Sequence, residues 1–219
     1  MSLDSHEARL TRLIAIRHGE TAWNVDTRIQ GQLDIGLNET GRWQAGRLAR
    51  ALADVTIDAV YSSDLLRALD TARAVANVAG QPVRLDASLR ERGFGSFEGL
   101  TYAEVESRFP DEARRWRQRD PQFAPEGGES LADFQARAVA AVAAIASRHR
   151  GQHVVVFTHG GVLDALYRAA SHITLDAPRT WHLGNAGINR LLHGDHGFTL
   201  VGWADMLHLE APSLEEGSA

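Results

Sequence analysis

Two histidines stand close behind apolar runs that are typical of buried strands. His18 follows the run Leu13–Ile16 and is preceded by Arg17, and His159 follows the run His153–Phe157. An imidazole can attack an electrophile or carry a proton, and a guanidinium binds oxyanions. A single histidine at a strand end is more often a hydrogen-bonded structural residue. Two such histidines with an arginine beside one of them favour an anion-binding pocket that contains a nucleophile.

The same two histidines could instead bind a metal ion. A zinc site needs further Cys, His, Asp or Glu ligands, but the chain has no cysteine and no obvious carboxylate partner stands near them. A second pair, His193 and His196, flanks Gly194-Asp195, where a polar hairpin turn is favoured over a metal site. We therefore expect neither a metal ion nor a cofactor.

These residues can act together only if the fold brings the ends of their strands to one edge. The chain predicts strands at Leu13–Ile16, Ala59–Tyr61, Pro82–Leu85, His153–Phe157, Ile188–Leu192 and Phe198–Trp203. It predicts helices from Asn38 to about Ala53, from Leu65 to Val78, from Thr101 to Arg119 with an interruption at Pro110, from behind Ser130 to about Arg148, and from Gly161 to about Ser171. Alternating strands and helices indicate an α/β fold, with a mostly parallel sheet between two layers of helices. In such sheets ligands bind beyond the carboxyl ends of the strands.

Local signals mark several element ends. Asn38 is expected to cap the start of its helix, and Gly80 stands where a left-handed helix end belongs. The last two strands are expected to form a hairpin around a turn at Gly194-Asp195.

Several segments, in order, resemble one protein family. Residues 17–24 (RHGETAWN) resemble the RHG signature of the histidine phosphatase superfamily, which contains the cofactor-dependent phosphoglycerate mutases. The further matching segments are residues 30–37 (QGQLDIGL) with Gly41, 62–72 (SSDLLRALDTA), 89–99 (LRERGFGSFEG), 128–130 (GES) and 156–161 (VFTHGG). Two details depart from the family pattern, because Gly36 stands where proline is usual and the residues around Glu91 are shifted.

The resemblance implies both a fold and a set of roles. The fold is a three-layer α/β/α arrangement like that of phosphoglycerate mutase, with a mostly parallel central sheet and a helical insertion over the site. His18 would be the nucleophile that accepts the phosphoryl group. Arg17 and Arg67 would hold the phosphoryl oxygens with their planar forks, and His159 would donate to the same oxygens. Glu91 would be the general acid and then the base that activates water.

On the substrate side, the resemblance places Asn24, Gln30 and Gly31.

Other residues are interpreted without the family resemblance. The arginines at positions 114, 115, 117 and 119 surround Trp116 and favour a solvated helix face; the alternative is that this segment covers the site and meets an anionic substrate. Trp43 and Trp181 favour packing roles, and His182 and Asn185 are expected near the edge that a substrate could reach.

The implied function is that of a metal-independent phosphomonoesterase that acts on small phosphorylated metabolites through a phosphohistidine. The chain is shorter than family mutases usually are, and Gly31-Gln32-Leu33-Asp34 stands where these tend to carry a TGW-type segment. Both features favour the broad-specificity and α-ribazole-phosphate phosphatase branch. The alternatives are a 2,3-bisphosphoglycerate-dependent phosphoglycerate mutase and, more remotely, a non-catalytic phosphate-binding protein.

Length and composition limit the class of protein. The 219 residues are expected to form a single domain, 1–219, with flexible tails at about 1–10 and 211–219. The net charge of −5 argues against nucleic acid as a partner, and no apolar run approaches a membrane span. The polar start and the lack of cysteine favour a cytoplasmic protein. The expected partner is a small phosphorylated substrate or inorganic phosphate, and a homo-oligomer is compatible with the sequence.

Overall fold

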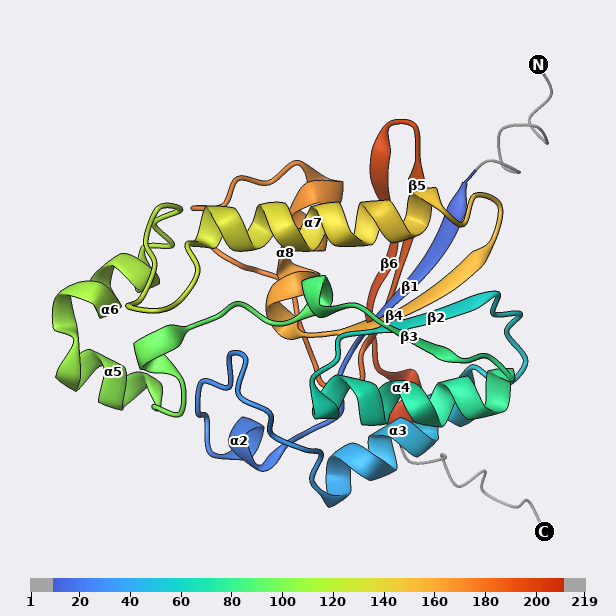
Figure 1. Cartoon of the computed structure of the whole chain (residues 1–219), viewed down its shortest axis with the longest axis horizontal. Helices are drawn as coiled ribbons and strands as arrows, with labels where there is room; N and C mark the ends of the chain where they lie inside the picture. Colours follow the sequence, from blue (N-terminus) through green and yellow to red (C-terminus); the bar gives the residue numbers. More distant parts are fainter. Residues whose placement is uncertain (1–9, 211–219) are drawn as a thin grey trace, which may run out of the picture.

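The central feature of the structure is one sheet with the strand order β3-β2-β4-β1-β5-β6 (Figure 1). This computed structural model describes residues 10–210, so nearly all of both expected tails lies outside the described residues. The strands are β1 (Thr11–Arg17), β2 (Ala59–Ser62), β3 (Val83–Leu85), β4 (His153–Thr158), β5 (Ile188–Gly194) and β6 (Gly197–Asp205). The first four run parallel, whereas β5 is antiparallel to β1 and β6 is antiparallel to β5. The expected mostly parallel sheet with a final hairpin is confirmed.

The helices follow the predicted pattern with local differences. They are α2 (Ala22–Val25), α3 (Glu39–Ala51), α4 (Leu66–Ala79), α5 (Tyr102–Arg108), α6 (Pro110–Arg117), α7 (Leu131–Ser147) and α8 (Gly160–Ser171), with short 3-10 turns at Ala87–Leu89, Gly95–Phe97 and Leu207–Leu209. The side chain of Asn38 accepts from the backbone N–H of Gly41, and Gly80 ends α4 with φ of 63°, as expected. Pro110 occupies the first turn of α6, where its missing N–H costs no helix bond, so the interruption is a junction between two helices.

The hairpin turn was predicted one residue too early. β5 continues to Gly194 and β6 begins at Gly197, which places Asp195 and His196 in the turn. Gly197 has φ of 90°, a backbone conformation that favours glycine. The turn therefore requires glycine at position 197, directly after the two turn residues.

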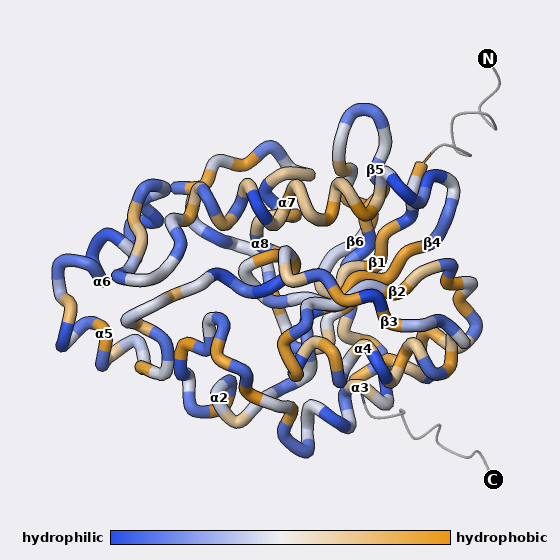
Figure 2. Tube along the Cα trace, in the orientation of Figure 1, coloured by the Kyte–Doolittle hydropathy of each residue, from blue (hydrophilic) through white to orange (hydrophobic). Residues whose placement is uncertain are grey.

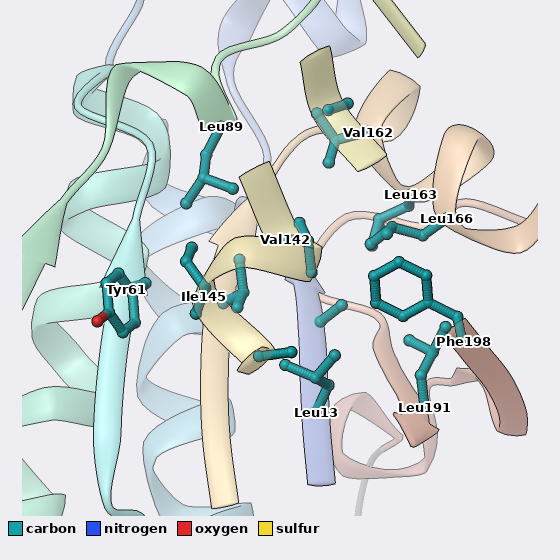
Figure 3. Close-up of a cluster of buried hydrophobic side chains, with 14 of the residues drawn as sticks. Leu13, Tyr61, Leu89, Val142, Ile145, Val162, Leu163, Leu166, Leu191 and Phe198 are labelled. Atoms are coloured by element: carbon teal, nitrogen blue, oxygen red, sulfur yellow. The ribbon is translucent and has the colours of Figure 1, made fainter. Parts of the chain in front are cut away.

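Alternate residues of the strands supply two separate cores. Leu13 and Ala15 of β1 pack with α7 and α8 on one face of the sheet, in the cluster drawn in Figure 3. Ile14 and Ile16 pack on the opposite face with α3 and α4. Figure 2 shows that the hydrophobic trace is concentrated in the strands, whereas the outer loops are mainly hydrophilic. The three-layer α/β/α arrangement is confirmed, since each sheet face is buried by its own pair of helices.

The helical insertion has a small core of its own. Helices α5 and α6 lie to one side of the sheet in Figure 1. Phe97 is fully buried between Phe109, Trp116 and Phe123, with ring centroids 5.5 to 6.1 Å apart. This aromatic cluster fixes the insertion as a rigid unit. Between residues 10 and 210, no helix has the length and apolar character that crossing a membrane would require.

The loop after β1 packs directly on the first turn of α3. A Cβ atom on Gly41 would lie 2.1 Å from the backbone oxygen of Glu20, and one on Gly19 would lie 2.6 Å from the backbone oxygen of Gly41. Only glycine at both positions allows this backbone contact. The contact holds the segment that carries His18 against the helix layer.

We predict opposite effects for two glycine-to-alanine substitutions in α3. Gly41→Ala should lower the free energy of unfolding by about 2 kcal/mol, because the new methyl group meets backbone that cannot move aside. Gly46→Ala, whose Cβ would have nothing within 4 Å, should raise it by about 1 kcal/mol through helix propensity alone. Urea denaturation of both variants measures the difference. Stabilisation by both substitutions would show that the contact with the β1 loop carries no strain.

Candidate active site

The carboxyl ends of β1, β2 and β4 bring the predicted residues to one place. Arg17 of β1 pairs in register with Thr158 of β4, so His18 and His159 follow at the same level of the sheet. Their ring centroids are 5.3 Å apart. His18 lines a cavity of about 810 Å³, whereas His159 does not, and the lining also includes Arg17, Asn24, Gln30, Gly31, Arg67 and Glu91. His159 is fully buried beside His18.

His18 is held with one ring nitrogen occupied and the other available. Nδ1 lies 2.7 Å from the backbone oxygen of Gly19. Because a carbonyl oxygen only accepts, Nδ1 carries the ring proton and Nε2 keeps its lone pair. The side-chain amide of Asn185 donates to the backbone oxygen of His18, which further fixes this residue. The Nε2 lone pair of His18 is therefore available to an electrophile in the cavity.

The surroundings keep both imidazoles neutral. Burial, reinforced by the positive charges of Arg17 and Arg67, holds the pKa of His18 well below its usual range. Burial also lowers the pKa of His159 well below its usual range, with Arg67 as the next cause. A neutral imidazole is the form that can attack a phosphorus atom.

His159 immediately precedes α8, and its ring contacts a serine. Its Nε2 lies 2.9 Å from Oγ of Ser63, and Nδ1 is buried without a hydrogen-bond partner. When the Ser63 hydroxyl donates to Nε2, the ring proton resides on Nδ1. This nitrogen can then donate to an oxyanion beside His18.

Arg67 and Arg17 are aimed by backbone carbonyls rather than by acidic side chains. The terminal nitrogens of Arg67 donate to the backbone oxygens of Gly31 (2.7 Å) and Leu33 (2.8 Å), and a terminal nitrogen of Arg17 donates to the backbone oxygen of Leu183. The Nε of each arginine is buried without a partner. Burial lowers the pKa of Arg67 to about 10 and also lowers the pKa of Arg17, yet both remain cations at neutral pH. Part of the expected fork-to-oxyanion contact is thus used within the protein, and the Nε of each arginine is one of the donors that remain.

Glu91 is the carboxylate that the fold turns into the cavity. Its two oxygens accept from the backbone N–H groups of Arg92 (2.9 Å) and Gly161 (3.0 Å). The nearby Glu98 accepts from the backbone N–H groups of Gln32 and Phe94, and it does not line the cavity. These bonds position Glu91 across the cavity from the histidines without an ion pair that would occupy it.

The substrate-side residues also line the cavity. Oδ1 of Asn24 accepts from the backbone N–H of Thr21 and from the amide of Asn185. Gln30 is buried, and its Oε1 has no partner. Gly31 has φ of 51°, and a Cβ there would lie 2.0 Å from Oε1 of Glu98. Asn185, expected near this edge, contacts the His18 loop directly.

The outer wall contains residues that sequence reasoning missed or assigned elsewhere. Trp181, predicted to be a packing residue, lines the cavity and stacks on Tyr167 at 4.1 Å between ring centroids. Asp164 and Arg179 line it without having been predicted, and the expected His182 does so too. These residues come from α8 and from the loop that follows it, and no local pattern marks them.

The basic segment 114–119 was interpreted either as a solvated helix face or as a cover over the site, and different arginines fit each interpretation. Arg114 and Arg115 pair with Asp111 and Asp120 on the surface. Arg117 and Arg119 line the cavity, and Arg119 forms an ion pair with Asp164. The segment therefore covers the site at one end and faces solvent at the other. Trp43 is half exposed, as befits an edge residue.

The remaining histidine pair was expected to lie at a hairpin turn, and it does. His193 packs on Phe198 with ring centroids 4.8 Å apart, and His196 lies in the turn itself. Among residues 10–210, no group of three His, Cys, Asp or Glu side chains is arranged to hold a metal ion.

Comparison with known proteins places this arrangement among phosphoryl-transfer enzymes. The family model of the histidine phosphatase superfamily (branch 1) matches residues 13–206. The chain is 39% identical over 212 residues to phosphoglycerate mutase-like protein 4 of Arabidopsis thaliana, covering 94% of this chain and 90% of that protein. It is 37% identical over 209 residues to a metal-independent phosphoserine phosphatase of the same organism, covering 94% of this chain and 86% of that one.

A solved structure agrees with the fold. The mycobacterial glucosyl-3-phosphoglycerate phosphatase, solved as a complex with VO3, superimposes with a TM-score of 0.78 at 36% identity. The match covers 88% of this chain and 98% of that chain.

The buried histidines predict a specific pH dependence of stability. Both have a pKa in the folded protein below the unfolded value of about 6.5, so the unfolded chain binds more protons in mild acid. Their contribution to stability is complete above this unfolded pKa and is lost as the pH falls below it. For each pH unit of acidification below this unfolded pKa, each histidine should lower the free energy of unfolding by up to about 1.4 kcal/mol.

Denaturant unfolding of wild type and His159→Asn between pH 7.5 and 5 measures this contribution. The variant should lose less stability on acidification, because one buried imidazole no longer titrates on unfolding. The carboxylates are common to both proteins and cancel in the difference. Parallel curves would show that His159 is not kept neutral by the fold.

Proposed function

The chain belongs to branch 1 of the histidine phosphatase superfamily, and we propose that His18 carries its reaction as a phosphohistidine. The protein is an enzyme of the phosphomonoester hydrolase class, like the relatives named as phosphatases. Its substrates are small phosphorylated metabolites. The observation that carries the proposal is the contact of His18 Nδ1 with the backbone oxygen of Gly19, which places the ring proton on Nδ1 and leaves Nε2 with its lone pair, in a cavity that Arg17 and Arg67 also line.

The first half of the reaction transfers the phosphoryl group to the protein. Nε2 of His18 attacks phosphorus, and the bond from phosphorus to the ester oxygen breaks. Glu91, in its protonated form, gives a proton to that oxygen, so the leaving group departs as a neutral alcohol. The products of this half are phosphohistidine, the free alcohol and the Glu91 carboxylate.

The second half returns the enzyme to its starting state. Water enters where the alcohol has left, Glu91 removes one of its protons, and the water oxygen attacks phosphorus. The bond from phosphorus to Nε2 then breaks, inorganic phosphate leaves, and Glu91 is again protonated. Each proton and bond is therefore accounted for by His18, Glu91 and water.

Four donors surround the transferred group. These are Nε of Arg17, Nε of Arg67, Nδ1 of His159 and the N-terminus of α8, which begins at Gly160. Each charge-assisted hydrogen bond contributes about 1.5–3 kcal/mol. Because these donors are already in place and buried, they stabilise the developing charge without rearrangement. They supply the electrostatic stabilisation that metal ions supply in kinases, so we propose that turnover needs neither a metal nor a cofactor.

Phosphoglycerate mutase activity is the weaker alternative. The names of several relatives point to it, and the first chemical half would be identical. A mutase must keep water from the phosphohistidine until a second hydroxyl is in place. Here Tyr102, Arg179 and His182 line the cavity and are themselves exposed, which favours entry of water.

The expectations on the protein as a whole remain proposals. We propose that residues 1–219 form one catalytic domain and that the protein acts in the cytoplasm. Its substrate is a small phosphomonoester, and neither nucleic acid nor membrane is proposed as a partner. Assembly into a homo-oligomer is left to measurement.

Trapping the phosphorylated protein tests the proposed function. Wild type mixed with p-nitrophenyl phosphate in EDTA and quenched in base should retain phosphate in a bond that is labile in acid and stable in base. His18→Ala should retain none and should lose at least about 10³-fold in kcat, because the nucleophile is absent. Circular dichroism of the variant controls for folding. Activity that EDTA abolishes and a divalent metal restores, or phosphate trapped equally by His18→Ala, would contradict the proposal.

A further inference from the structure

Buried polar atoms without partners gather around the cavity. Three of them, Nε of Arg17, Nε of Arg67 and Nδ1 of His159, belong to the phosphoryl site. Three more lie on cavity-lining residues outside it, and these are Oε1 of Gln30, Oδ1 of Asp164 and Nε1 of Trp181. A buried polar atom without a partner is unfavourable by about 1–3 kcal/mol, so such atoms at a cavity wall indicate a ligand that pairs with them.

Asp164 is a buried carboxylate with one oxygen used and one free. Its Oδ2 accepts from Arg119 (2.8 Å) and from Arg168 (2.9 Å), which balance its charge. Its Oδ1 is buried and accepts from no group in the described part of the chain, and the residue is only 7% exposed. The free oxygen can only accept, so its partner must be a hydrogen-bond donor.

Trp181 supplies the complementary group on the same wall. Its indole N–H is buried and has no acceptor. Arg168 joins the two residues, because its Nε binds Asp164 and its guanidinium carbon lies 4.8 Å from the Trp181 ring centroid. The terminal nitrogens of Arg168 donate to the backbone oxygens of Thr174 and Ala177, which holds the loop leading to Trp181 against α8.

The position of Asp164 suits the leaving group rather than the phosphoryl group. It lies three residues after Gly161, on the same face of α8, and the backbone N–H of Gly161 binds Glu91. Three residues of helix rise by about 4.5 Å. Asp164 therefore lies about one helical turn along α8 from the N–H that binds Glu91 and lines the same cavity, so we infer that it faces the leaving group.

One functional group satisfies both free atoms. A hydroxyl can pair with either atom, because it both donates, as Oδ1 of Asp164 requires, and accepts, as Nε1 of Trp181 requires, whereas an ammonium group suits only the first and a carboxylate only the second. The amide of Gln30 can present either its oxygen or its nitrogen to a further hydroxyl. The cavity volume of about 810 Å³ leaves room for a sugar-sized group beside the phosphate.

We propose that Asp164 and Trp181 form a hydroxyl-recognition subsite that selects phosphomonoesters of sugars or other polyols. This inference rests on the proposed phosphatase function. It assigns specificity to residues that take no part in the transfer of the phosphoryl group.

The test compares two esters that differ in their hydroxyls. Glucose 6-phosphate and cyclohexylmethyl phosphate both attach the phosphate through a methylene group on a six-membered ring, but only the first carries hydroxyls. We expect kcat/KM for phosphate release to be at least about tenfold higher for glucose 6-phosphate, the effect of one hydrogen bond to a charged group. A similar comparison of 2-aminoethyl phosphate with ethyl phosphate measures the response to an ammonium group.

Two variants remove the subsite by different routes. Asp164→Asn keeps an oxygen for the arginines and turns the free acceptor into an N–H donor, and Trp181→Phe removes the indole N–H while keeping a ring against Tyr167. Each should reduce the preference for glucose 6-phosphate at least about threefold. Trp203→Phe is the control, because Trp203 also packs on Tyr167 but donates to the backbone oxygen of His182 and does not line the cavity. It should preserve the preference.

The outcomes separate this inference from the proposed function. Equal kcat/KM for the two ring esters, or a preference that survives both Asp164→Asn and Trp181→Phe, would overturn the subsite while leaving a phosphatase. A larger preference for the ammonium-bearing ester would overturn the choice of hydroxyl. Absence of phosphate release from every ester, p-nitrophenyl phosphate included, would overturn the proposed function and the subsite with it.

Discussion

The site depends on two largely buried guanidinium groups, Arg17 and Arg67, that backbone carbonyls hold in place, with Glu91 as a carboxylate in the same cavity. Arg67 is only 1% exposed, and its terminal nitrogens donate to backbone carbonyls instead of an acidic side chain. Desolvation of a guanidinium is costly, as the lowered pKa of Arg67 indicates. The same positive field and burial keep His18 neutral and therefore nucleophilic. In the proposed reaction, a phosphoryl dianion would pair with the free donors and balance the charge, so the cost of burying the guanidinium groups would favour its binding.

Such a site needs a rigid frame, and the sheet provides one. The parallel register of β1 with β4 places the two histidines at one level, and the two apolar cores hold the strands from both faces. The close contact between Gly19 and Gly41 then fixes the loop that carries His18. A displacement of these groups by even about 1 Å would misplace the donors relative to the oxyanion, at a large cost in rate.

The parts of the fold that depend on nearby residues were predictable. Buried strands, the cap at Asn38 and the left-handed end at Gly80 follow from short patterns, and ordered motifs identified His18, Arg67 and His159. Contacts that join distant segments were not predictable. The pairing of Arg119 with Asp164 and the place of Trp181 in the cavity wall depend on how the insertion and the loop after α8 fold over the sheet. The four-residue helix α2 was also missed, because it is too short to show a period and is held by a capping box between Thr21 and Asn24.

The central claim is that His18, His159 and the two arginines enclose one site for a tetrahedral or trigonal-bipyramidal oxyanion. A crystal structure of the protein with orthovanadate tests it most directly. We expect vanadium bonded to Nε2 of His18, with equatorial oxygens in hydrogen-bond contact with Nε of Arg17, Nε of Arg67 and Nδ1 of His159. Vanadate bound away from Nε2 of His18, or bound there with the two guanidinium Nε groups turned toward other partners, would contradict the account.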